Sequence, residues 1–167
     1  MGRAALLAAG FWLGLLVASW VMATVTLRMP DRVLGPRIRP ELAQRLASVP
    51  EEDRRQALRH LAGEINRWMF RRFAVAQVAL AIVFLVLAWP AGGVLRMLAV
   101  LALLTTLAQV GLTGPIAAAG RGIEFLPRPL PADLARRFGM LHAAYAAADL
   151  AKMGALGLAA FLLARRP

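Results

Sequence analysis

Four long apolar segments alternate with basic, proline-containing connections along the 167-residue chain. The apolar segments are residues 4–27, 73–89, 94–114 and 140–163. Each approaches the roughly 20 apolar residues that a helix needs to cross a hydrocarbon core about 30 Å thick. Because a backbone without water must form its hydrogen bonds within the segment, each span must be helical. The pattern predicts an all-α fold, a four-helix transmembrane bundle in a single integral membrane domain over residues 1–167.

The first apolar segment also has features of a signal peptide, since Arg3 precedes it and VMA at residues 21–23 resembles a cleavage site. Its apolar run is longer than the roughly 7–15 residues typical of such peptides. We therefore expect it to remain as the first transmembrane helix.

The connection between the first two spans contains a helical insertion at about residues 38–72. Pro40 and Pro50 occupy positions typical of a first helical turn, and acidic residues follow both, where they favour the positive end of a helix. Apolar residues then recur at three- and four-residue spacing, at Leu58, Leu61, Ile65 and Trp68. This spacing predicts an amphipathic helix over residues 51–72 that continues into the second span, with its apolar face against the bundle, the loop or the lipid interface.

The amino-acid composition supports a membrane protein and excludes several kinds of functional site. Hydrophobic residues make up 60% of the chain, against about 45–50% in soluble domains. The formal charge of +11 on so apolar a sequence indicates basic loops rather than a nucleic-acid surface. The absence of cysteine excludes disulfides, thiolate metal sites and a cysteine nucleophile.

Basic residues are concentrated in two connections. The first and third connections contain Arg28, Arg32, Arg37, Arg39, Arg45, Arg54, Arg55, Arg59, Arg67, Arg71, Arg72, Arg121, Arg128, Arg136 and Arg137. The positive-inside rule then places residues 29–72 and 115–139 in the cytoplasm and both termini outside or in the periplasm of a cell or inner membrane. Anionic lipid headgroups are candidate partners for Arg54, Arg55, Arg59, Arg67, Arg71 and Arg72. The alternative is that these arginines only enforce topology.

Small residues recur at four-residue spacing in the first and last spans. Gly10, Gly14 and Ala18 form one such stripe, and Ala147, Ala151 and Ala155 form another. Such stripes let helices approach closely, so we expect both to support a compact bundle.

The last span carries an unusual set of polar side chains: His142, Tyr145, Asp149 and Lys152. At about 100° per residue they lie within an arc of roughly 80° on one helix face. Asp149 and Lys152 are three residues apart, so their opposite charges can pair where a single charge would cost about 3 kcal/mol.

Other polar residues of the spans are candidates to complete a buried cluster around this pair. They are Gln77, Gln109, Thr105, Thr106, Ser19 and Thr24. Two interpretations of the cluster remain open. An acid beside a base, with His142 and Tyr145 on the same face, is typical of a proton-coupled transporter or a polar-ligand site. A neutralised pair with amide neighbours can instead fix the register of helices in a bundle.

A metal or haem site is a weaker alternative. The only histidines are His60 and His142, and they could meet only if the helical insertion folded back under the bundle. Met140 or Met153 would then have to supplement them as soft ligands. The sequence contains no zinc-protease motif, phosphate-binding glycine loop or acidic pair placed for hydrolysis. We therefore expect no cofactor and no enzymatic activity.

Four sequence stretches resemble a known family. GFWLGLL, AGEINRWMFRRF, TGPIAAAGRGIE and RFGMLHAAYAAADL look like the small bacterial membrane proteins related to transmembrane protein 205. The resemblance implies a four-helix membrane domain with a Leu-His pair, Leu141 and His142, opening the last helix. Residues 30–55 look like an insertion, and the Asp149–Lys152 pair is not part of the family pattern.

Together these observations predict a multi-pass integral membrane protein of bacterial inner-membrane type. We expect a structural or accessory component, with a membrane protein or a second copy of the chain as a candidate partner. A small transporter that uses the polar stripe of the last span is the alternative.

Overall fold

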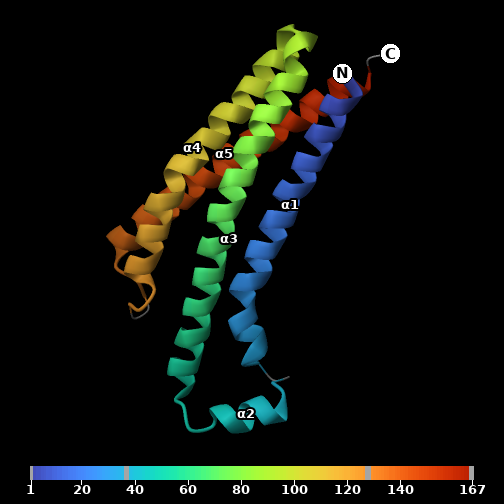
Figure 1. The fold of residues 1–167 in the computed structure, drawn as a ribbon. Helices are drawn as coiled ribbons and strands as arrows, with labels where there is room; N and C mark the ends of the chain where they lie inside the picture. Colours follow the sequence, from blue (N-terminus) through green and yellow to red (C-terminus); the bar gives the residue numbers. More distant parts are fainter. Residues whose placement is uncertain (1, 36–37, 127–128, 166–167) are drawn as a thin grey trace. The chain divides into compact units, whose positions relative to one another are not determined.

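The computed structural model describes residues 2–35, 38–126 and 129–165, and in these residues it contains helices and no strands (Figure 1). The elements are α1 (Gly2–Val33), α2 (Pro40–Leu46), α3 (Glu51–Ala88), the short 3-10 helix η1 (Trp89–Ala91), α4 (Gly93–Ile123) and α5 (Ala132–Ala164). Helices α1, α3, α4 and α5 are long and apolar enough to cross a membrane. The predicted all-α fold is confirmed, and the chain is a multi-pass membrane protein.

The chain divides into two compact units, and the first contains part of every long helix. It comprises residues 1–18 and 71–167, so it holds the first half of α1, the second half of α3, and helices α4 and α5. Its core consists of Ala5, Ala9, Trp12, Leu16, Ala81, Phe84, Ala88, Leu95, Ala99, Ala102, Leu156, Ala159 and Leu163. Alanine supplies seven of these positions, which lets helix backbones pack closely where lipid provides no hydrophobic driving force. This unit is the four-helix bundle.

A tight turn joins α3 to α4 within the bundle. Gly92 precedes α4 with a φ angle of 68° and a ψ angle of −176°, a combination that is essentially restricted to glycine. Gly93 follows with a φ angle of 45°. The two glycines therefore allow the chain to reverse immediately after η1.

Several helices are longer than the apolar segments that predicted them. The third apolar segment ends at residue 114, but α4 continues through Pro115 to Ile123, so the helix is longer than the apolar segment that predicted it. A proline removes one intrahelical hydrogen bond without forcing a long membrane helix to stop. The non-helical part of the connection expected over residues 115–139 is correspondingly short, because α4 ends at Ile123 and α5 begins at Ala132.

The small-residue stripe of α1 does not contact another helix. Gly10 and Gly14 are exposed, and a methyl group added to either would meet no other atom within 4 Å. Ala18 is exposed as well, as are Ala147 and Ala151 on α5. The expectation that these stripes support close packing inside the bundle is therefore wrong for these positions, whereas Ala155 of the second stripe is buried.

The second unit covers residues 19–70 and contains the end of α1, helix α2 and the first half of α3. Asn66 is buried and donates a hydrogen bond from Nδ2 to the carbonyl oxygen of Ala23 at 3.5 Å. Near the far end of α1, Asp31 lies 3.7 Å from a guanidinium nitrogen of Arg55 and 3.8 Å from one of Arg59. Within this unit, these contacts hold α1 and α3 side by side.

Helix α3 confirms the prediction of one continuous helix from residue 51 into the second span. Its 38 residues correspond to about 57 Å at about 1.5 Å per residue, far more than a membrane core requires. Leu61, Ile65 and Trp68 are 55%, 46% and 59% exposed. These three side chains are therefore at least partly exposed, and contact of this face with the lipid interface stays a prediction.

Candidate functional site

The bundle contains a buried polar cluster centred on Lys152, which lies near the middle of α5. Asp149 precedes it by three residues and thus lies on the same face of α5. Gln77 reaches the cluster from α3 and Gln109 from α4. All four side chains are between 0% and 3% exposed. The cluster, which we call the lysine cluster, thus joins three helices of the first unit.

Three oxygen atoms surround the ammonium group of Lys152. Its Nζ atom donates hydrogen bonds to Oε1 of Gln77 and to Oε1 of Gln109. The third oxygen is Oδ1 of Asp149, at 3.2 Å. An ammonium group has three N–H donors, so the number of neighbouring oxygen atoms equals the number of its donors.

The first helix contributes an aromatic ring to the same place. Nζ of Lys152 lies 5.9 Å from the ring centre of Trp12 on α1, within the range of a cation–π interaction. The indole ring also meets Phe84 of α3 edge to face, with ring centres 6.4 Å apart. Trp12 is completely buried, and its Nε1 atom has no hydrogen-bond partner among the described residues. Side chains of all four long helices therefore converge on Lys152.

This arrangement offsets the cost of placing charges in a membrane. A single charged side chain at the bilayer centre costs about 3 kcal/mol on insertion scales, and such residues face the protein interior and pair. Asp149 supplies the opposite charge at 3.2 Å from Lys152, and the two amides accept hydrogen bonds from the ammonium group. Chemically, the cluster is a neutral hydrogen-bonded junction between helices.

The amide of Gln109 ties α4 to α5 a second time. Its Nε2 atom donates a hydrogen bond to the backbone carbonyl of Tyr145 at 3.2 Å, while its Oε1 atom accepts from Lys152. A glutamine has both a donor and an acceptor end, so it can bridge the ammonium and a carbonyl at once. A leucine at this position would lose both bonds.

The polar stripe predicted for α5 is only partly buried. Asp149 and Lys152 lie in the core, Tyr145 is half-buried, and His142 is exposed. The imidazole of His142 stacks on Phe138 with ring centres 5.4 Å apart. The structure therefore brings Asp149, Lys152, Gln77 and Gln109 together and leaves His142 at the surface.

The hydroxyl residues named as candidates bond to their own helices. Thr106 is buried and donates to the carbonyl of Ala102 at 2.7 Å, and Thr105 donates to the carbonyl of Leu101 at 2.9 Å. Thr24 is exposed and bonds to Trp20 in the same way, at 2.8 Å. Ser19, although buried, belongs to the second unit. None of the three threonine hydroxyls is needed to complete the lysine cluster.

The two histidines do not form a metal site with acidic neighbours. His60 lies in the second unit and His142 in the first. Within residues 2–35, 38–126 and 129–165, no group of three or more His, Cys, Asp and Glu side chains is placed to hold a metal ion. The described geometry gives no support to a metal at either residue.

Trp12 is the participant that the sequence pattern did not single out. It stands in a continuous apolar segment, where a tryptophan is typical of ordinary packing. Its spacing relative to other residues of α1 carries no information about α5. By contrast, the two glutamines were identifiable because amides are rare in apolar spans.

Comparison with known proteins gives no relative for this chain: no protein-family model, no curated protein and no solved structure matches it.

Proposed function

We propose that the chain is a structural or accessory component of the membrane, and that the lysine cluster serves to fix the register of its helices. The observation that carries this proposal is the environment of Lys152. Its ammonium group is 0% exposed and faces three acceptor oxygens from three side chains. A buried polar group that specifies how helices pair is the best-attested use of such groups.

The transport alternative requires a different environment for the same residues. A proton carrier or substrate site needs polar side chains open to a pathway, with donors or acceptors that can exchange partners. Here the ammonium donors are occupied by neighbouring side chains, and the exposed His142 does not join them. These contacts favour the structural role over transport.

The double variant Asp149→Leu/Lys152→Met tests the proposed function. If the pair only holds helices together, the variant should restore growth, or uptake of any affected solute, to a strain that lacks the protein. Expression level and membrane insertion should be measured alongside, with the wild-type chain as the reference. A variant that is folded and inserted at the wild-type level but fails to complement would support transport and contradict the structural role.

We further propose that the protein lies in a bacterial inner membrane with both termini external. The support is the distribution of arginine, because 15 of the 20 basic residues lie in the first and third connections. The long helical insertion before the second span then projects into the cytoplasm. The resemblance to proteins related to transmembrane protein 205 agrees with this membrane location and remains a proposal.

The topology predicts how an introduced cysteine reacts. The chain has no cysteine, so Arg45→Cys creates a single thiol in the first connection. We expect a membrane-impermeant maleimide to leave it unlabelled in intact cells and to label it after the membrane is opened. Gly2→Cys, at the opposite side in this topology, should be labelled in intact cells. The reverse labelling pattern would show that the first connection is external and the N-terminus cytoplasmic, contrary to the proposed topology.

Anionic lipid at the cytoplasmic surface is the partner that we propose for the second unit. Three of its candidate arginines already have acidic neighbours. Arg55 lies 2.8 Å from Glu51, Arg67 lies 2.7 Å from Glu64, and Arg59 pairs with Asp31. The side chains of Arg55 and Arg59 are exposed, and exposed ion pairs are weak, so these two guanidinium groups can still meet headgroups. The side chain of Arg67 is only 13% exposed. The exposed Trp68 would add an interfacial aromatic anchor.

A further inference from the structure

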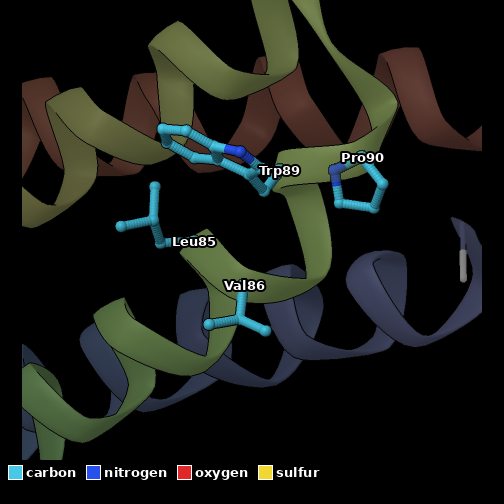
Figure 2. Close-up of a pocket in the computed structure, with 4 residues that line it drawn as sticks. All are labelled: Leu85, Val86, Trp89 and Pro90. Carbon is cyan, nitrogen blue, oxygen red and sulfur yellow. The ribbon is translucent and has the colours of Figure 1, made fainter.

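An open apolar hollow lies where α3 ends and the turn toward α4 begins. Leu85, Val86, Trp89 and Pro90 line it, and its volume is about 410 Å³. Figure 2 shows these side chains around the last turn of α3 and the short η1 helix. Val86 is 65% exposed and Trp89 is 49% exposed. The hollow therefore opens to the surroundings of the bundle and not to its core.

A single arginine stands beside this hollow. The guanidinium of Arg96 lies 4.4 Å from the ring centre of Trp89, and one of its N–H groups donates to the backbone carbonyl of Trp89 at 3.3 Å. A guanidinium has five N–H donors, and the others have no hydrogen bond to any described residue. Trp89 thus forms both a wall of the hollow and the platform on which the cation rests.

The position of Arg96 is unfavourable for helix stability and for topology. It is the fourth residue of α4, close to the helix end whose partial positive charge disfavours a cation. In the predicted topology, it also lies on the side of the membrane opposite the two arginine-rich connections. Arg96 is thus a cation at the positive end of a helix and on the arginine-poor side of the membrane. Because its guanidinium group is also exposed and has unused donors, we infer that its partner is an anionic group.

We propose that this end of the bundle binds an anionic phospholipid. The phosphodiester of the headgroup accepts hydrogen bonds from Arg96, and an acyl chain lies in the hollow formed by Leu85, Val86, Trp89 and Pro90. The positive charge of Arg96 favours an anionic headgroup, and the apolar lining of the hollow favours an acyl chain. The neighbouring tryptophan suits the membrane interface, where its ring sits between the apolar core and the headgroups.

Lipid binding to the full-length protein in detergent tests the proposal. Native mass spectrometry would follow dioleoyl phosphatidylglycerol added to the wild type and to Arg96→Gln, with the phosphatidylcholine of the same acyl chains in parallel. We expect the wild type to bind the anionic lipid more tightly, and Arg96→Gln to weaken that binding about fivefold, the worth of one basic residue at an anionic surface. Equal binding by wild type and Arg96→Gln would overturn the proposal.

Two further variants separate this site from general attraction to charge. Arg165→Gln is the matched control, because the guanidinium of Arg165 also rests on an aromatic ring, 4.2 Å from the ring centre of Phe161. It should bind lipid as the wild type does. Val86→Trp fills the hollow and keeps Arg96, and it should weaken binding as strongly as Arg96→Gln. An equal loss in Arg165→Gln, unchanged binding by Val86→Trp, or a second copy of the chain in place of lipid would each contradict the proposed site.

Discussion

The substitution Lys152→Met is expected to lower the free energy of unfolding by about 3–5 kcal/mol. It removes the cation that pairs with Asp149 and leaves that carboxylate in the bundle core, where it is 3% exposed. It also removes the donor that the Oε1 atoms of Gln77 and Gln109 share. The loss would be measured by unfolding in mixed detergent micelles, with the wild-type chain under the same conditions.

The double variant Asp149→Leu/Lys152→Met separates the charge from the hydrogen bonds. It removes the unpaired carboxylate, so it should be clearly more stable than Lys152→Met alone. It should not reach the wild type, because the acceptor oxygens of Gln77 and Gln109 lose their donor, and an unsatisfied buried group costs about 1–3 kcal/mol. From the sequence alone, without these glutamine contacts, the same replacement would be expected to be nearly neutral.

An isosteric control tests the charge separately. Asp149→Asn keeps the shape of the side chain but leaves Lys152 with neutral acceptors only and no counter-charge. It should therefore be destabilising, though less so than Lys152→Met, because the ammonium keeps both glutamine bonds. If Lys152→Met were as stable as the wild type, the two charges would not meet in a buried site. This result would contradict the structural role proposed for the lysine cluster.

The broad architecture was predictable because the bilayer imposes it. An apolar run of about 20 residues has no alternative to a helix in a membrane, so the four spans were identifiable from hydropathy alone. Their ends were not, since α4 continues past Pro115 to Ile123. The apolar pattern marks what must avoid water, whereas the end of a helix depends on local hydrogen bonding and packing outside the membrane as well.

The lysine cluster was predictable in part for a related reason. Asp149 and Lys152 share a face through helical geometry, which the sequence contains directly. Which amide on another helix reaches them depends on helix rotation and depth, and these are set by packing. Gln77 and Gln109 were the available amides and do reach Lys152. His142 lies on the same face of α5 as Asp149 but is exposed. A position on this face was therefore not enough to predict burial.

The glycine stripe illustrates the opposite error. Gly10 and Gly14 have the spacing that favours helix association, yet no atom lies within 4 Å of a methyl group added to either. The bundle instead uses the opposite side of α1, where Ala5, Ala9, Trp12 and Leu16 are buried. Two alanines and two large side chains fill this interface, and the small residues of the stripe stay exposed. Spacing alone could not distinguish these two faces because both are apolar.

Trp12 forms the aromatic side of the lysine cluster, and its truncation should have the second large effect. Trp12→Ala is expected to lower the free energy of unfolding by about 3–5 kcal/mol, the usual cost of truncating a buried tryptophan. The indole is completely buried and contacts both Phe84 and Lys152. In a membrane the loss comes from missing packing contacts and the cavity left behind, because lipid tails solvate apolar groups as well as the core does.

Phe11→Ala provides a matched control, because Phe11 precedes Trp12 on the same helix but is 62% exposed. It should change stability little. Trp12→Phe should recover much of the loss in Trp12→Ala: it restores a ring and removes an indole N–H that has no partner among the described residues. Unfolding in mixed micelles, with all three variants in parallel, would measure the order of stability. If Trp12→Ala and Phe11→Ala were equally stable, α1 would not pack on the lysine cluster, and the cluster would join three helices instead of four.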